Sequence, residues 1–108
     1  MAYYFFNRCP KKVFPKIEAL VQELGLIEIE ALEGYRLWAG NILNRPKDFD
    51  KKFTVRYSEK KDPLMLETSG RVSHKQKDVK VLVRQFIDIC KPTEIRDCFN
   101  PYDLREFE

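Results

Sequence analysis

The sequence predicts an α+β fold: an antiparallel sheet of about four to five strands with two main helices on one face and a short helical C-terminal tail. Two segments have apolar residues at the spacing of a helix, and several others alternate apolar and polar residues as strands do. Turn residues join the alternating strands in pairs, which favours antiparallel hairpins under a helical layer. Because the chain has 108 residues, one domain spanning residues 1–108 is expected.

The first two predicted elements are a strand and a helix. Residues 2–7, AYYFFN, are aromatic without polar alternation, so both faces of this strand are expected to meet apolar groups. In residues 13–25, VFPKIEALVQELG, Pro15 is tolerated in a first helical turn and Gly25 ends the helix. One face of this helix is apolar and carries Ile17, Leu20, Val21 and Leu24.

Two hairpins follow the first helix. Residues 26–39 alternate on both sides of a turn signal at Gly34, and residues 53–58 are joined to residues 64–68 by the turn residues KKDP. The segment between the hairpins, residues 40–52 (GNILNRPKDFDKK), has no period. It is predicted to be a long loop, and long loops are more often functional than the elements they join.

Residues 71–90, RVSHKQKDVKVLVRQFIDIC, predict the longest helix. Ser73 and Gln76 have the spacing of a capping box that would open it. One side of this helix is apolar, and the opposite side is a basic stripe made of Lys77, Lys80, Arg84 and Lys91. The stripe is mostly lysine, which suits contact with phosphate or with an acidic protein surface and not the reading of base edges.

The tail after Pro92 is predicted to form short helical pieces. Thr93, and the pair Asn100-Pro101 followed by Asp103, are residues that commonly start helices. Apolar side chains would let this tail pack on the body of the domain. They are Ile95, Phe99, Tyr102, Leu104 and Phe107.

Charge is unevenly distributed along the chain. The 20 Lys and Arg exceed the 17 Asp and Glu to give a net charge of +3, and residues 36–61 hold eight bases against three acids. Residues 17–34, by contrast, hold five Glu and no base. A basic middle with acidic flanks suits an oriented partner better than a uniform sheath of phosphate.

The composition favours a cytoplasmic protein without a membrane span. No apolar run reaches the roughly 20 residues that a transmembrane helix needs, and the first residues lack the order of a secretory signal. The three cysteines, Cys9, Cys90 and Cys98, are then expected to be reduced packing residues and not a disulfide framework.

No motif for catalysis, metal binding or a cofactor stands out, so an enzyme is not predicted. His74 is the only histidine and is expected to be an exposed residue in the first turn of its helix. The cysteines and His74 are too far apart in sequence for the short-spaced pairs of a zinc site. A reactive thiol at Cys9 is the one catalytic alternative, because Arg8 and two lysines flank it and nearby cations favour thiolate.

The predicted function is therefore binding. We expect a small protein-binding module of the inhibitor, immunity or adaptor kind, with a basic and aromatic surface that faces an acidic partner. Aromatic and arginine side chains dominate such interfaces, and complementary charge speeds association. The predicted partner-binding residues are Trp38, Arg45, Lys47, Lys51, Lys52, Arg56, Tyr57, Lys77, Lys80 and Arg84.

Nucleic-acid binding is the alternative, with RNA or single-stranded DNA held on the same basic surface. The layout is similar to that of RNA-recognition domains, in which aromatic side chains of two central strands stack on bases. The segments YYFFN and KKFTVRYS fall near those two strands, although the second lacks the glycines of that pattern. A purely structural subunit is the remaining alternative.

Overall fold

The computed structural model describes residues 2–30, 34–41, 52–58, 64–68 and 73–108. The helices are α1 (Phe14–Glu23) and α2 (Lys77–Cys90), with the 3-10 turns η1 (Lys11–Val13) and η2 (Leu104–Phe107). The strands are β1 (Ala2–Phe6), β2 (Ile27–Ile29), β3 (Tyr35–Asn41), β4 (Lys52–Ser58), β5 (Leu64–Thr68) and β6 (Ile95–Arg96).

The strands form one six-stranded antiparallel sheet in the order β2-β3-β4-β5-β1-β6. The two predicted hairpins are present as the pairs β2–β3 and β4–β5. β1 pairs with β5 and β6, both distant in sequence, so the first strand lies inside the sheet next to its β6 edge. The predicted α+β class is confirmed, and the sheet has six strands where four to five were expected.

The sixth strand, β6, is the element that sequence patterns missed. Its two residues pair with the end of β1, Ile95 with Phe6 and Arg96 with Phe5. The predicted helix start at Thr93 is wrong, because the side-chain oxygen of Asn7 accepts hydrogen bonds from the backbone N–H groups of residues 93 and 94 and holds the chain beside β1. A strand of two residues has no period that a sequence could reveal.

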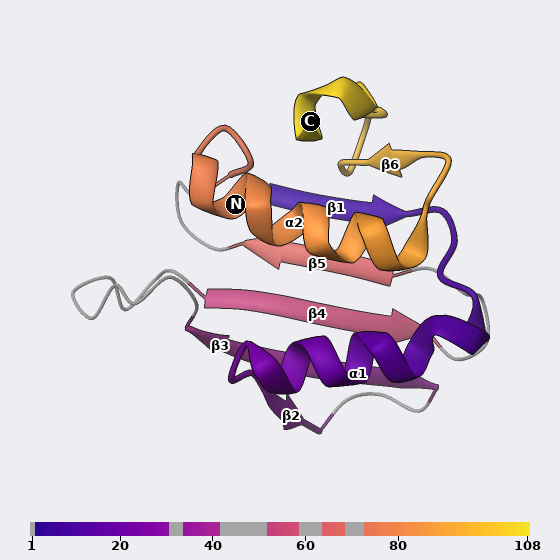
Figure 1. Cartoon of the computed structure of the whole chain (residues 1–108), viewed down its shortest axis with the longest axis vertical. Helices are drawn as coiled ribbons and strands as arrows, with labels where there is room; N and C mark the ends of the chain where they lie inside the picture. The colour runs from indigo at the N-terminus through magenta and orange to yellow at the C-terminus, as the bar shows by residue number, and fades with distance from the viewer. Residues whose placement is uncertain (1, 31–33, 42–51, 59–63, 69–72) are drawn as a thin grey trace.

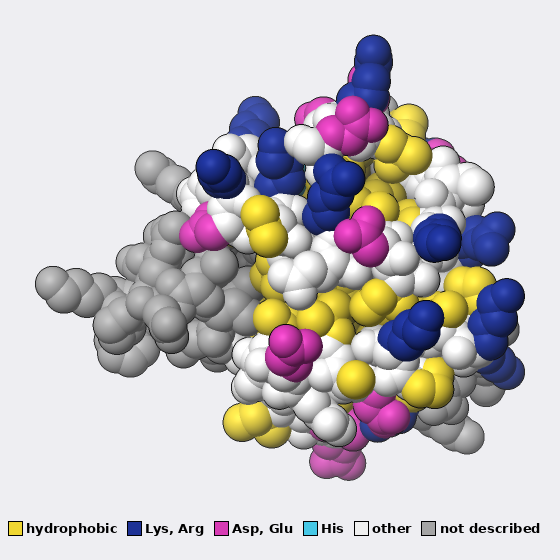
Figure 2. Space-filling view, in the orientation of Figure 1, with side chains coloured by type: hydrophobic (Ala, Val, Ile, Leu, Met, Phe, Trp, Pro, Cys, Tyr) yellow, Lys and Arg dark blue, Asp and Glu magenta, His cyan; other side chains and the backbone are white. Residues whose placement is uncertain are grey.

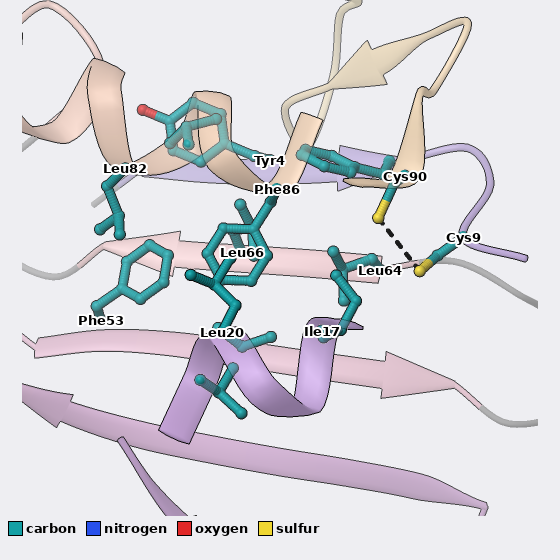
Figure 3. Close-up of a cluster of buried hydrophobic side chains, with 14 of the residues drawn as sticks. Tyr4, Cys9, Ile17, Leu20, Phe53, Leu64, Leu66, Leu82, Phe86 and Cys90 are labelled. Carbon is teal, nitrogen blue, oxygen red and sulfur yellow. Dashed lines mark hydrogen bonds between the residues drawn. The ribbon is translucent and has the colours of Figure 1, made fainter. Parts of the chain in front are cut away.

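Both α-helices lie on one face of the sheet, α1 over β3 and β4 and α2 over β5 and β1 (Figure 1). Alternate strand residues point toward this layer and form the core, because successive side chains of a strand point to opposite faces. The rings of Phe53 on β4 and Phe86 on α2 are 5.9 Å apart across the interface, and Figure 3 shows the cluster around them. The core is thus a single layer between helices and sheet.

Helix α1 follows its sequence pattern closely. Pro15 lies in its first turn, and Ile17, Leu20 and Val21 are its buried residues. The helix ends at Glu23, and Gly25 adopts a φ of 75°, a left-handed conformation that glycine accepts without steric cost.

Helix α2 begins later than the sequence predicts. The N-terminal cap is Gln76, whose side chain makes no capping bond, and the Oγ of Ser73 accepts only from the N–H of Lys75. The backbone N–H of Gln76, which a capping box would give to the Ser73 side chain, donates to the Ser73 carbonyl oxygen at 2.9 Å, so the predicted capping box at residues 73–76 does not form. The backbone N–H of His74 donates to the hydroxyl of Tyr4 in β1 at 2.8 Å, a buried bond that ties the chain before the helix to the sheet.

The C-terminal tail is docked beside α2 on the helical side of the sheet (Figure 1). A capping box does form here: Asp103 and Glu106 bond to each other's backbone N–H groups and open η2. Phe107 is buried to 2 % exposure, and its ring contacts Tyr4 and Tyr102. The sequence prediction of helix-start residues near Asp103 is confirmed.

Replacing Phe107 by Ala should destabilise the fold by about 3 kcal/mol, because the cost of truncating a buried phenylalanine includes the cavity left behind. Phe99 in the same tail is 83 % exposed, so Phe99→Ala is a matched control with an expected change below about 0.5 kcal/mol. Urea unfolding measures both. Equal effects of the two substitutions would contradict the docked tail.

Candidate functional site

Two of the predicted binding residues, Trp38 and Tyr57, lie in the core and not on the surface. They are 3 % and 2 % exposed. Both side chains point toward α1, where Phe14 lies 4.5 Å from the Tyr57 ring and 6.1 Å from the Trp38 ring. The prediction of these aromatic anchors is wrong, because β3 and β4 turn these positions toward the helices.

The basic stripe of α2 is partly occupied by the chain's own tail. Lys80 donates from Nζ to the carbonyl oxygen of Glu108 at 2.9 Å, and Arg84 donates to the carbonyl oxygen of Phe107 at 3.0 Å. Lys77 is exposed. Two of these predicted partner-binding residues therefore hold the tail in place.

The predicted basic loop lies largely outside the described residues. Arg45, Lys47 and Lys51 lie outside the described residues, and Lys52 begins β4 opposite Asn41. Arg56, at the centre of β4, is exposed. Of the predicted set, Arg56 is the described residue that lies on the sheet and faces away from the helices.

The second face of the sheet is covered by no described helix, although Met65 and Ser58 on it are buried. Paired residues of neighbouring strands share a face, so the partners of each outward residue can be followed across the sheet. One such row runs Ile29, Leu37, Arg56, Met65, Phe5 and Arg96. We call this surface the open face, and its described residues are Tyr3, Phe5, Ile27, Ile29, Tyr35, Leu37, Ala39, Thr54, Arg56, Ser58, Met65, Glu67 and Arg96.

The open face is most apolar at the β2 edge. Ile27 is 69 % exposed and Ile29 is 45 % exposed, and Leu37 on β3 is half-buried beside them. The intervening Glu28 points to the other side, where it pairs with Arg36 at 2.8 Å. Two exposed isoleucines on an edge strand are the kind of surface that soluble proteins commonly protect.

An arginine and a tyrosine lie next to this apolar edge. The guanidinium carbon of Arg56 is 5.3 Å from the centre of the Tyr35 ring, a cation–π contact that holds the side chain in one orientation. No carboxylate of the described residues forms an ion pair with Arg56. By contrast, Arg36 on the helical side is bound by both Glu18 and Glu28.

The far side of the open face carries aromatic rings on β1. Tyr3 and Phe5 are half-buried and stack with their centroids 6.0 Å apart. Glu67 lies opposite Tyr3 on β5, and its negative charge and hydrogen bond raise the pKa of the Tyr3 hydroxyl. The expectation that both faces of β1 meet apolar groups is therefore met fully on the helical side and partly on this one.

His74 is a buried structural residue and not the exposed one predicted from sequence. Its Nδ1 lies 3.1 Å from the Tyr4 hydroxyl, and its Nε2 lies 3.3 Å from a carboxylate oxygen of Glu106. The rings of Tyr102 and Phe107 enclose it. Tyr4 and His74 are buried whereas Glu106 is exposed, and this chain of polar groups connects β1, the start of α2 and the tail.

Cys9 is also buried, whereas the predicted reactive thiol depended on the cations that flank it in sequence. Its exposure is 0 %, and the cations beside it in sequence, Arg8, Lys11 and Lys12, are exposed. Its sulfur faces Cys90 of α2 instead.

Comparison with known proteins assigns no class to the chain, and the α+β architecture rests on the structure alone. No family model matches the chain, and no curated protein or solved structure matches it either. Within the residues that the structure describes, none of the helices has the length and apolar character to cross a membrane.

The Glu67→Gln substitution should lower the pKa of Tyr3 toward its ordinary value of 10.0, because the carboxylate is the main cause of the upward shift. A raised pKa in the folded state stabilises the fold below the ordinary value, and this contribution is lost as pH rises through the raised value. NMR titration of the tyrosine ring measures the shift. Glu23→Gln, an exposed carboxylate of α1, is the control that should leave Tyr3 unchanged.

Proposed function

We propose that this protein is a non-enzymatic protein-binding module and that the open face is its binding surface. The observation that supports this proposal is the exposure of Ile27 and Ile29 next to the stacked pair Arg56 and Tyr35. Exposed apolar residues that lie together on a sheet, with polar residues around them, mark interaction sites in soluble proteins. The proposal moves the predicted surface from the helical side to the opposite face.

The composition of the open face fits the centre of a protein interface. Such centres are rich in tyrosine and arginine, and a few of these residues carry most of the binding energy. Arg56 is already oriented by Tyr35, so less side-chain freedom is lost when it binds. The half-buried Leu37 and Phe5 would extend an apolar contact across the sheet.

The partner that fits this surface is a protein with an apolar patch and a carboxylate placed against Arg56. Among the side chains described, the open face holds two bases, Arg56 and Arg96, and one acid, Glu67, which already bonds to Tyr3. An acidic group on the partner would therefore meet an unsatisfied guanidinium, and complementary charge would orient the encounter. An inhibitor, immunity protein or adaptor works by this kind of contact.

Nucleic-acid binding is less favoured, because the stacking rings of β1 and the described basic stripe of α2 lie on opposite sides of the sheet. Figure 2 shows the helical side, where Lys and Arg gather around α2 and the tail with Asp and Glu among them. Tyr3 and Phe5 face the other way. Single-stranded nucleic acid binds where basic side chains and aromatic rings lie along the same groove. In this sheet β5 also separates β1 from β4, so the two aromatic strands are not neighbours.

Arg56→Glu should weaken partner binding at least about 30-fold, the loss that corresponds to a hot spot of roughly 2 kcal/mol. Ile27→Lys should weaken it as well, by introducing a charge into the apolar contact. Both residues are exposed, so thermal unfolding should change little. The measurement is capture of a stoichiometric partner from the native host, followed by titration of the purified pair by calorimetry.

Lys77→Glu is the matched control, because Lys77 is exposed on the helical side and should leave the affinity unchanged. Loss of binding with Lys77→Glu but not with Arg56→Glu would return the site to α2 and contradict the proposal. Binding to a random oligonucleotide that weakens steeply as salt rises, with no protein captured, would favour nucleic acid instead.

A further inference from the structure

Cys9 and Cys90 form a buried pair of thiols that the proposed binding function does not use. Their Sγ atoms are 3.2 Å apart, and Cys90 donates a hydrogen bond to Cys9 (Figure 3). The two side chains are 0 % and 2 % exposed. Sulfurs at this distance need to approach by only about 1.2 Å to reach the length of a disulfide bond, close to 2.0 Å.

The backbone around the two sulfurs is held in place independently of them. The Asn7 side chain, two residues before Cys9, bonds to the backbone N–H groups of Thr93 and Glu94, just after Cys90. The N–H of Asn7 also donates to the carbonyl oxygen of Glu94 at 3.1 Å. The end of β1 and the end of α2 are thus fastened side by side, so the two thiols stay together in the folded chain.

We propose that Cys9 and Cys90 are a two-electron redox site, at which hydrogen peroxide converts the thiol pair into an intramolecular disulfide. The sequence-based expectation of reduced packing residues holds for Cys9 and Cys90, which are buried free thiols, and the proposal adds a redox role to that packing role. The proposal rests on the 3.2 Å distance between the two sulfurs. The sequence does not reveal this contact, because the two residues are far apart in the chain.

The reaction has two balanced steps. The Cys9 sulfur, the hydrogen-bond acceptor of the pair, attacks one oxygen of the peroxide; the O–O bond breaks, Cys9 becomes a sulfenic acid, and water leaves. The Cys90 sulfur then attacks the Cys9 sulfur, forming the S–S bond and releasing the sulfenic oxygen as a second water. The two thiols lose two protons and two electrons, which the peroxide accepts.

The environment of the pair selects the oxidant. The hydrogen bond to Cys9 and burial raise the pKa of the Cys90 thiol, so its attack on the Cys9 sulfenic acid is slow compared with that of an activated thiol. Hydrogen peroxide is small and uncharged, whereas a bulky disulfide oxidant would have to reach sulfurs that lie inside the core. Cys98, in contrast, is exposed and has no neighbouring thiol among the described residues.

The disulfide would close a long loop, from the end of β1 to the end of α2. A cross-link of this length restricts the unfolded chain strongly. The oxidised protein should therefore unfold at a higher temperature than the reduced one, and dithiothreitol should reverse the increase.

The test treats the full folded chain with hydrogen peroxide and then counts thiols in denaturant, with mass spectrometry of proteolytic fragments. We expect the monomer to keep one thiol of its three, to lose the mass of two hydrogen atoms, and to yield a fragment that joins Cys9 to Cys90. Cys98→Ser, at an exposed position, should form the same cross-link and keep no thiol.

Three results would overturn the proposal. They are a treated monomer that retains all three thiols, a product cross-linked through Cys98, and oxygen added at Cys9 or Cys90 without a cross-link. Cys90→Ser should prevent the intramolecular disulfide while Cys9 remains. Because the wild-type protein gives the decisive mass, the test does not depend on whether a core variant folds.

Discussion

A sheet has two faces, and the two helices of this chain cover only one of them. The aromatic residues of β1, β3 and β4 divide between these faces according to the strand period. Tyr4, Trp38 and Tyr57 turn toward the helices and make the core, whereas Tyr3 and Tyr35 turn away. The position of the candidate binding surface follows from this division, since the side chains that leave the core are the ones that form the open face.

The tail has a larger structural role than its short elements suggest. Phe107 fills a space next to Tyr4, the carboxylate of Glu106 lies against His74, and the last carbonyl groups accept hydrogen bonds from Lys80 and Arg84. A basic stripe on an isolated helix would attract phosphate or an acidic protein. Here part of that stripe is used internally, which is why the open face supports the binding hypothesis better than α2 does.

The sequence predicted those elements whose pattern repeats over many residues. The apolar face of α1 and the hairpins β2–β3 and β4–β5 were correct because helical spacing and alternation are local signals. The predicted start of α2 was wrong, because the Gln76 N–H bonds to the Ser73 carbonyl oxygen and not to its side chain, while the His74 backbone is tied to Tyr4, 70 positions away. β6 was missed for a related reason: it exists through its pairing with β1 and the Asn7 side chain.

By itself, the sequence determined the α+β class, the helix and strand segments with a clear period, and the presence of exposed charge. It also included Arg56 in the predicted binding set, and the proposed open face retains this residue. The tertiary structure decided which face of each strand is covered, and so buried Trp38 and Tyr57 and exposed Ile27 and Ile29. It also brought Cys9 to Cys90. Alternation shows that two residues share a face, but which face a helix covers depends on contacts between segments far apart in the chain.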